Sequence, residues 1–285
     1  KFKFMHKTAI IIVSRERYSL LASCLESVLD NSSGNIKVYV GCDSDDPQTI
    51  EVAKKYKATA AVIEPQPVFD RASFDKIIYQ HDTCDYIFYI NDDITIQTKD
   101  FDIIIQETIE EFLKDKPDRI VYGCCQEIWP GYSQEAPGLK LAMEKELELK
   151  YACYPVLTRE TVDCLGFFMP PGLACGADIE LGRIFNTLKC SNIVPCQPRR
   201  LDIPIEIYDH IGHPGDSAKR DRPFDHSRHA QWLANAWHGG HAMDALINLS
   251  KHIQGALTPE RQVTDSDYSY IFDQLPLPMR LPQEP

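Results

Sequence analysis

The sequence lacks a long apolar run and is short of positive charge. Its most apolar early stretch, Ala9–Val13, is far shorter than the ~20 residues that a membrane-spanning helix needs. A basic opening precedes this stretch, but no small-residue cleavage site follows it, so we expect a core strand rather than a signal peptide. We therefore predict a cytoplasmic protein with no transmembrane segment. The formal net charge of −12 disfavours broad binding to nucleic acid or anionic membranes, because both reward clustered Lys and Arg.

Several short signatures are also missing. The chain has no GxGxxG and no GxxxxGKS/T sequence, so neither the dinucleotide-binding fingerprint nor the phosphate-binding P-loop is available. The ten cysteines include no CxxC pair and no regular spacing. We therefore expect reduced thiols rather than a disulfide framework or a zinc site.

The sequence does contain an alternation of β-rich runs with amphipathic runs, which predicts an α/β fold with a mostly parallel sheet and helices on both faces. The predicted strands lie at 8–13, 36–43, 58–65, 85–92, 119–125 and 203–209. The predicted helices lie at 20–31, 73–82 and 101–115, in the segment that follows Pro47, in the second part of “GLACGADIELGRIFNTL”, and on either side of Gly239. We expect a catalytic domain over residues 1–223. Residues 224–285 are predicted to form a C-terminal helical extension with a Pro-rich tail.

Polar residues follow the apolar strands of this predicted sheet. They are Ser14, Arg15 and Glu16 after the first strand, Asp43 at the end of the second, and Asn91, Asp92 and Asp93 after “YIFYI”. In parallel α/β sheets, ligands bind beyond the carboxyl ends of the strands. Adjacent carboxylates repel each other unless a cation lies beside them, and Mg²⁺ or Mn²⁺ prefers such oxygen ligands. The alternative is a solvated turn in which Asn91 and Asp92 bond to the nearby backbone.

The order of these motifs resembles that of the family-2-type glycosyltransferases, whose catalytic domain has the nucleotide-diphospho-sugar-binding GT-A fold. The resemblance covers roughly residues 8–217 and rests on “IIIVSRERYSLLASCLESVL”, “VYVGCDSDD”, “DRASFDKIIYQHDTCDYIFYINDDI”, “GADIELGRIF” and “IYDHIGHPGDS”. Asn91 stands where the DxD signature of that family has its first Asp. Ala177 stands where the family has an acid before the catalytic Asp.

The resemblance implies a role for each matched residue. Asp93 would bind Mn²⁺ or Mg²⁺, His210 would complete the metal site, and Asp178 would be the catalytic base. The nucleotide and its diphosphate would be held by a further set: Ser14, Arg15, Glu16, Asp43, Arg71, Asn91, Asp92, Lys219 and Arg220. His213 is close enough to His210 in the sequence to take its place.

The resemblance therefore implies a metal-dependent inverting glycosyltransferase. It would move a hexosyl or pentosyl unit from a nucleoside-diphosphate sugar, with uridine diphosphate as the expected nucleotide, to an acceptor hydroxyl. The acceptor stays open among a glycan, a lipid-linked sugar, a protein and a hydroxymethylated base of phage DNA. Two other functions stay open as well. One is a sugar-phosphate nucleotidyltransferase, although “SRERYS” lacks the expected glycines; the other is a non-catalytic nucleotide-sugar-binding protein.

Overall fold

The computed structural model of the 285-residue chain describes residues 7–65, 78, 83–128, 152–170, 177–190, 199–209 and 241–257. In these ranges, no helix combines the length and the apolar character that crossing a membrane requires. The seven cysteines whose side chains are described are free thiols, and six of them are buried.

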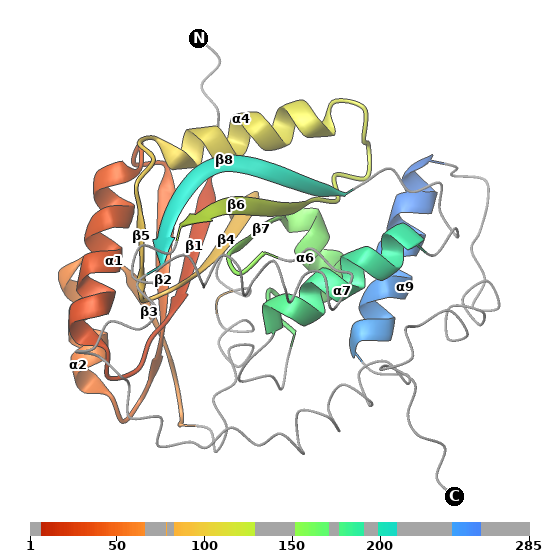
Figure 1. The fold of residues 1–285 in the computed structure, drawn as a ribbon. Coiled ribbons are helices and arrows are strands. Elements are labelled where there is room, and N and C mark those ends of the chain that lie inside the picture. The colour runs from red at the N-terminus through yellow and green to blue at the C-terminus, as the bar shows by residue number, and fades with distance from the viewer. Residues whose placement is uncertain are drawn as a thin grey trace, which may run out of the picture.

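The described strands form one eight-stranded sheet in the order β3-β2-β1-β4-β7-β6-β8-β5 (Figure 1). Its strands are β1 (Thr8–Val13), β2 (Ile36–Asp43), β3 (Thr59–Ile63), β4 (Tyr86–Asn91), β5 (Ile94–Ile96), β6 (Tyr122–Ile128), β7 (Pro155–Thr158) and β8 (Arg200–Asp209). Only β5 and β7 run against the others in this sheet. The predicted α/β fold with a mostly parallel sheet is therefore confirmed.

Helices cover both faces of the sheet (Figure 1). One face carries α1 (Tyr18–Asn31), α2 (Pro47–Lys55) and α4 (Phe101–Leu113), and the other carries α6 (Arg159–Leu165), α7 (Ala177–Cys190) and α9 (His241–Leu257). Side chains of β1 alternate between the two cores, with Ile10 and Ile12 on one side and Ile11 on the other. Because both faces are covered, β1 and β4 are apolar along almost their whole length instead of alternating with polar residues.

Some described elements were not predicted. The three-residue β5 directly follows Asp93, and such a short strand has too few residues to show a period. The segment that holds β7 and α6 was also missed, because β7 is an antiparallel strand inserted between β4 and β6. The strand predicted at 119–125 starts later, since Arg119 has a left-handed φ of 57° that an extended strand cannot contain.

The helix α9 packs on α6 and α7 and shares their core. Its buried side chains, among them Met243, Leu246, Leu249 and Ile253, belong to the same apolar cluster as Ile11 of β1. This helix therefore helps to cover the sheet. The domain boundary predicted at 223/224 lies outside the described residues and stays a prediction, and the helix predicted at 73–82 is described only at Ile78.

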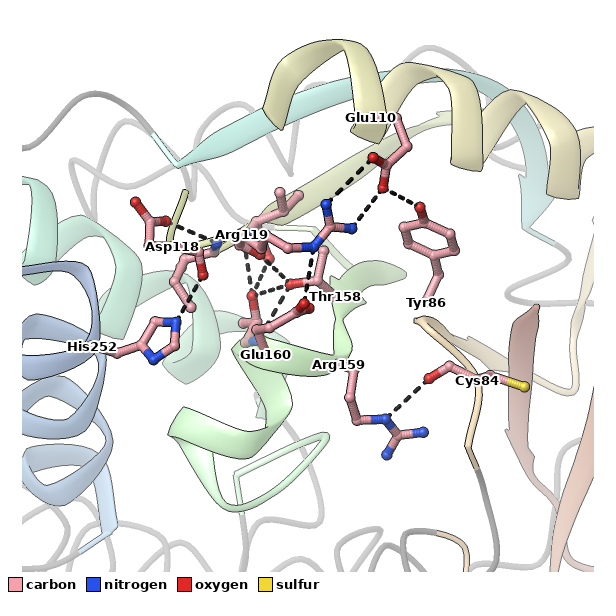
Figure 2. A network of polar contacts seen from close by, with 12 residues as sticks. Cys84, Tyr86, Glu110, Asp118, Arg119, Thr158, Arg159, Glu160 and His252 are labelled. Carbon is pink, nitrogen blue, oxygen red and sulfur yellow. Dashed lines mark hydrogen bonds and ion pairs between the residues drawn. The ribbon is translucent and has the colours of Figure 1, made fainter. Parts of the chain in front are cut away.

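A network of charged side chains ties the helices together at the edge where β4 begins (Figure 2). Arg119 donates to Glu110 of α4 at 2.6 Å and to Glu160 of α6 at 2.9 Å, while the Tyr86 hydroxyl donates to Glu110 at 2.5 Å. The hydrogen bond to Glu110 is the main cause that raises the pKa of Arg119. Thr158 caps α6 and donates to the Arg119 carbonyl at 2.6 Å, which holds the left-handed turn in place.

We predict that Arg119→Met destabilises the fold by about 1–3 kcal/mol, because two half-buried carboxylates lose their shared cation. Urea unfolding followed by circular dichroism measures the change. The matched control is Lys114→Met, which breaks the exposed pair with Glu111 and should cost no more than about 0.5 kcal/mol. Equal losses for the two variants would show that the network in Figure 2 does not hold α4 to α6.

Candidate functional site

The loop between β1 and α1 lies at the carboxyl ends of the parallel strands. We call the polar residues at the ends of β1, β2 and β4 the rim: Ser14–Arg17, Asp43–Asp46 and Asn91–Asp93. Because β1 pairs with β2 on one side and β4 on the other, this loop lies between the ends of those two strands. Glu16 has a left-handed φ of 56°, an uncommon conformation for a residue other than glycine. The two residues that flank Glu16 point in opposite directions: Arg15 reaches the end of β2, and Arg17 reaches the residues after β4.

The first half of the rim is an ion-pair cluster around Arg15. Its Nη1 donates to Asp43 Oδ2 at 2.5 Å and to Asp45 Oδ1 at 2.7 Å. Asp43 is only 2% exposed, whereas Asp45 faces solvent. The hydrogen bond to Asp45, reinforced by Asp43, raises the pKa of Arg15, so the guanidinium stays charged. This pair gives the end of β2 a fixed polar surface.

The second half of the rim is the adjacent carboxylate pair after β4. Arg17 bridges it: Nη1 donates to Asp92 Oδ1 at 2.9 Å and Nη2 to Asp93 Oδ2 at 2.7 Å. Ser14 donates to the other Asp92 oxygen at 2.6 Å. Asp92 and Asp93 are 3% and 8% exposed, so they do not form the solvated turn of the alternative interpretation.

Asp46 connects the β1–α1 loop to the start of α2. Its carboxylate accepts from the backbone N–H of Thr49 and so caps α2, with Pro47 at the first helical position. It also accepts from the Glu16 backbone N–H at 2.8 Å and from the Tyr18 hydroxyl at 3.1 Å. One buried carboxylate therefore fixes both the left-handed turn and the start of α2.

One oxygen of the rim has no partner. Asp93 Oδ1 is buried and accepts no hydrogen bond among the described residues. A buried acceptor without a donor is costly, and a hard divalent cation bound by one or two carboxylates would satisfy it. The two adjacent carboxylates thus fit Mn²⁺ or Mg²⁺, although the described residues include no cluster of three or more His, Cys, Asp or Glu side chains that could hold a metal. The buried Cys24 thiol contacts the Asn91 carbonyl at 3.5 Å, and burial followed by the charges of Asp92 and Asp93 raises its pKa, so it stays protonated.

A third carboxylate, Asp209, lies at the end of β8. It accepts a hydrogen bond from the buried Tyr154 hydroxyl, and its backbone pairs with Ile94, the first residue of β5. Burial chiefly raises the pKa of Tyr154, with contributions from Asp209 and a smaller one from Asp93. The Tyr154 hydroxyl therefore stays protonated at neutral pH and holds Asp209 at the end of β8 by its hydrogen bond.

Asp178 lies in the first turn of α7, half-buried, on the other face of the sheet. Tyr122, which lies close enough to Asp178 to be affected by its charge, stacks on Phe185 with ring centroids 4.8 Å apart and accepts from the Ala152 N–H at 2.7 Å. Burial is the main cause that raises the pKa of Tyr122, and Asp178 adds to it. A carboxylate in a first helical turn faces the positive end of the helix dipole.

The structure brings together one group of the predicted residues: Ser14, Arg15, Glu16, Asp43, Asn91, Asp92 and Asp93. A second group, Arg71, His210, His213, Lys219 and Arg220, lies outside the described residues. Sequence reasoning missed Arg17, Tyr154 and Asp209. The signal for Arg17 was its place two residues after Arg15 in “SRER”, whereas Tyr154 and Asp209 meet only through long-range strand pairing.

The described sheet can be compared with solved structures. TarS from S. aureus, residues 1–349, superposes with a TM-score of 0.53 and 10% identity, over 88% of this chain and 72% of that one. The mannosyltransferase PcManGT from Pyrobaculum calidifontis, solved with GDP-Man and Mn²⁺, gives 0.52 and 14% identity, over 94% of this chain and 79% of that one. The chain has the GT-A fold. At these identities the likeness concerns the fold alone. No protein-family model matches the chain, and no curated protein matches its sequence.

In this GT-A sheet the rim depends on the Asp46 anchor, which gives a test. We predict that Asp46→Ala destabilises the protein by about 1–3 kcal/mol, because it removes the α2 cap and leaves the Glu16 N–H unpaired. Asp45→Ala is the control, since Asp45 is exposed and Arg15 keeps its bond to Asp43. Thermal unfolding measures both variants. If Asp45→Ala lost as much as Asp46→Ala, the Asp46 anchor would be refuted.

Proposed function

We propose that this protein is a metal-dependent glycosyltransferase that moves a sugar from a nucleoside-diphosphate sugar to an acceptor hydroxyl. The single observation that carries the proposal is the buried Asp92–Asp93 pair at the carboxyl end of β4, with one oxygen unpaired. The GT-A fold supports it, as does the place of the pair at the edge where parallel α/β sheets bind ligands. Mn²⁺ in the PcManGT structure agrees with a divalent ion.

The donor would lie across the rim, with its nucleotide toward β2. Asp43 and the turn Ser14–Glu16 would hold the base and ribose, with uridine as the proposed base, since these side chains are fixed by the Arg15 cluster before any ligand arrives. Preorganised polar groups bind with less loss of side-chain entropy. Arg71, Lys219 and Arg220 are proposed to meet the diphosphate, with Asn91 beside it.

Asp93, together with Asp92, would hold Mn²⁺ or Mg²⁺, and His210 is proposed as a further ligand. When bound, the ion would neutralise negative charge on the departing diphosphate. Asp178 would accept the proton of the acceptor hydroxyl, and a single displacement of this kind inverts the anomeric centre. The residues of the chain thus divide the work, with the rim binding the leaving group and the start of α7 activating the acceptor.

We predict that Asp93→Ala and Asp178→Ala both lower the rate of sugar transfer at least about 10²-fold but differ in nucleotide binding. Asp93→Ala should weaken Mn²⁺-dependent binding of uridine diphosphate at least about tenfold, because it removes the proposed metal ligand. Asp178→Ala should leave that binding nearly intact and lower the transfer rate about 10²–10⁴-fold. Calorimetric titration with and without Mn²⁺ separates the two variants, and guanosine diphosphate in place of uridine diphosphate tests the base.

The matched control is Asp244→Ala, which changes an exposed carboxylate in the first turn of α9. It should bind and transfer like the wild type. Slow hydrolysis of a nucleotide sugar with Mn²⁺, which needs no acceptor, reports catalysis while the acceptor is unknown. Equal, metal-independent binding by the wild type, Asp93→Ala and Asp178→Ala would refute the proposed site, and binding without any hydrolysis would favour a non-catalytic binding protein.

A further inference from the structure

Arg17 occupies an unfavourable place in the chain. It is the N-cap residue of α1, a position that favours Ser, Thr, Asp and Asn, and its side chain caps no backbone group of the helix. The positive end of the helix dipole also disfavours a cation there. The Arg17 side chain therefore does not cap α1, and its guanidinium bonds to Asp92 and Asp93 after β4 instead.

Those contacts span both carboxylates of the pair. The two terminal nitrogens of one guanidinium reach Asp92 Oδ1 and Asp93 Oδ2 at 2.9 and 2.7 Å. The planar fork of an arginine can bridge two acceptors in this way, which the point charge of a lysine cannot reproduce. The guanidinium screens the repulsion between two adjacent carboxylates that are almost fully buried.

The pair is only partly neutralised by this bridge. Two carboxylates and one guanidinium leave a single negative charge, and Asp93 Oδ1 keeps no hydrogen-bond partner among the described residues. A divalent ion that joined the pair beside Arg17 would place two cations in contact in a buried site. A divalent ion that replaces Arg17 on Asp93 carries two positive charges, which neutralise the two carboxylates. It can also bind Asp93 Oδ1, the oxygen without a hydrogen-bond partner among the described residues.

We propose that Arg17 is a built-in counter-ion of the carboxylate pair, and that a divalent cation binds Asp93 in exchange for it. This inference rests on the proposed function, since it concerns the metal ligand assigned there. The exchange releases a guanidinium at the rim, where it is available to a negatively charged diphosphate. Binding of the metal to Asp93 and release of the Arg17 guanidinium for the diphosphate would therefore occur together.

The test is the affinity for Mn²⁺ alone, measured by electron paramagnetic resonance of the free ion without nucleotide. Arg17→Gln should bind Mn²⁺ about tenfold more tightly than the wild type at low ionic strength, because the competing charge is gone, and the gain should shrink in ~0.3 M salt. Arg17→Lys should show a smaller gain, since its ammonium competes without bridging both carboxylates. It also serves as the second variant if Arg17→Gln does not fold.

Two further variants make the outcomes distinct. Arg200→Gln removes the same charge from a residue that pairs with Asp202 and should leave Mn²⁺ affinity within about threefold of the wild type. Asp93→Asn should abolish the binding. If Arg17→Gln leaves the affinity unchanged or weakens it while Asp93→Asn abolishes it, the exchange is overturned and the proposed metal site stands. If Asp93→Asn binds Mn²⁺ like the wild type, the proposed metal site itself is wrong.

Discussion

The burial of two adjacent carboxylates at the end of β4 is the constraint on which the rest of the rim depends. Charges taken out of water are expensive unless they are paired and hydrogen-bonded, and two like charges side by side are more expensive still. Ser14 and Arg17 meet that requirement from the β1–α1 loop, and the loop keeps its shape because Asp46 holds the Glu16 turn. The polar side chains around the pair thus form one mutually dependent set.

The two ends of the sheet carry different work. At the amino end of β4 the charges are paired within the fold, as Arg119 is with Glu110 and Glu160, and the described contacts there join helix to helix (Figure 2). At the carboxyl end a buried acceptor of Asp93 is left over. Buried polar atoms without a hydrogen-bond partner among the described residues also occur at the amino end, such as Thr8 Oγ1, but Asp93 Oδ1 belongs to a carboxylate pair at the edge where parallel α/β sheets bind ligands. This carboxylate pair is the physical ground for the metal site that we propose at the carboxyl end.

Much of the sheet could be predicted from the sequence because β1 and β4 are almost continuous apolar runs, and because acidic residues lie at the end of β2 and directly after β4. The same pattern located Asp43, Asp92 and Asp93. Periodicity could not reveal that the side chain of Arg17 bridges Asp92 and Asp93. These two contacts join residues that are 75 and 76 positions apart in the sequence. Nor could periodicity reveal the antiparallel β7 or the contact of Tyr154 with Asp209, which depend on which strands become neighbours.

The most direct measurement of the central claim is the position of the metal in a crystal soaked with a uridine diphosphate sugar and Mn²⁺. Anomalous scattering at the manganese edge locates the ion independently of the rest of the density. The account predicts a peak about 2.2 Å from a carboxylate oxygen of Asp93, with the diphosphate beside it at the rim. A nucleotide bound elsewhere, with no manganese peak at Asp93 and Arg17 still between the two carboxylates, would contradict it.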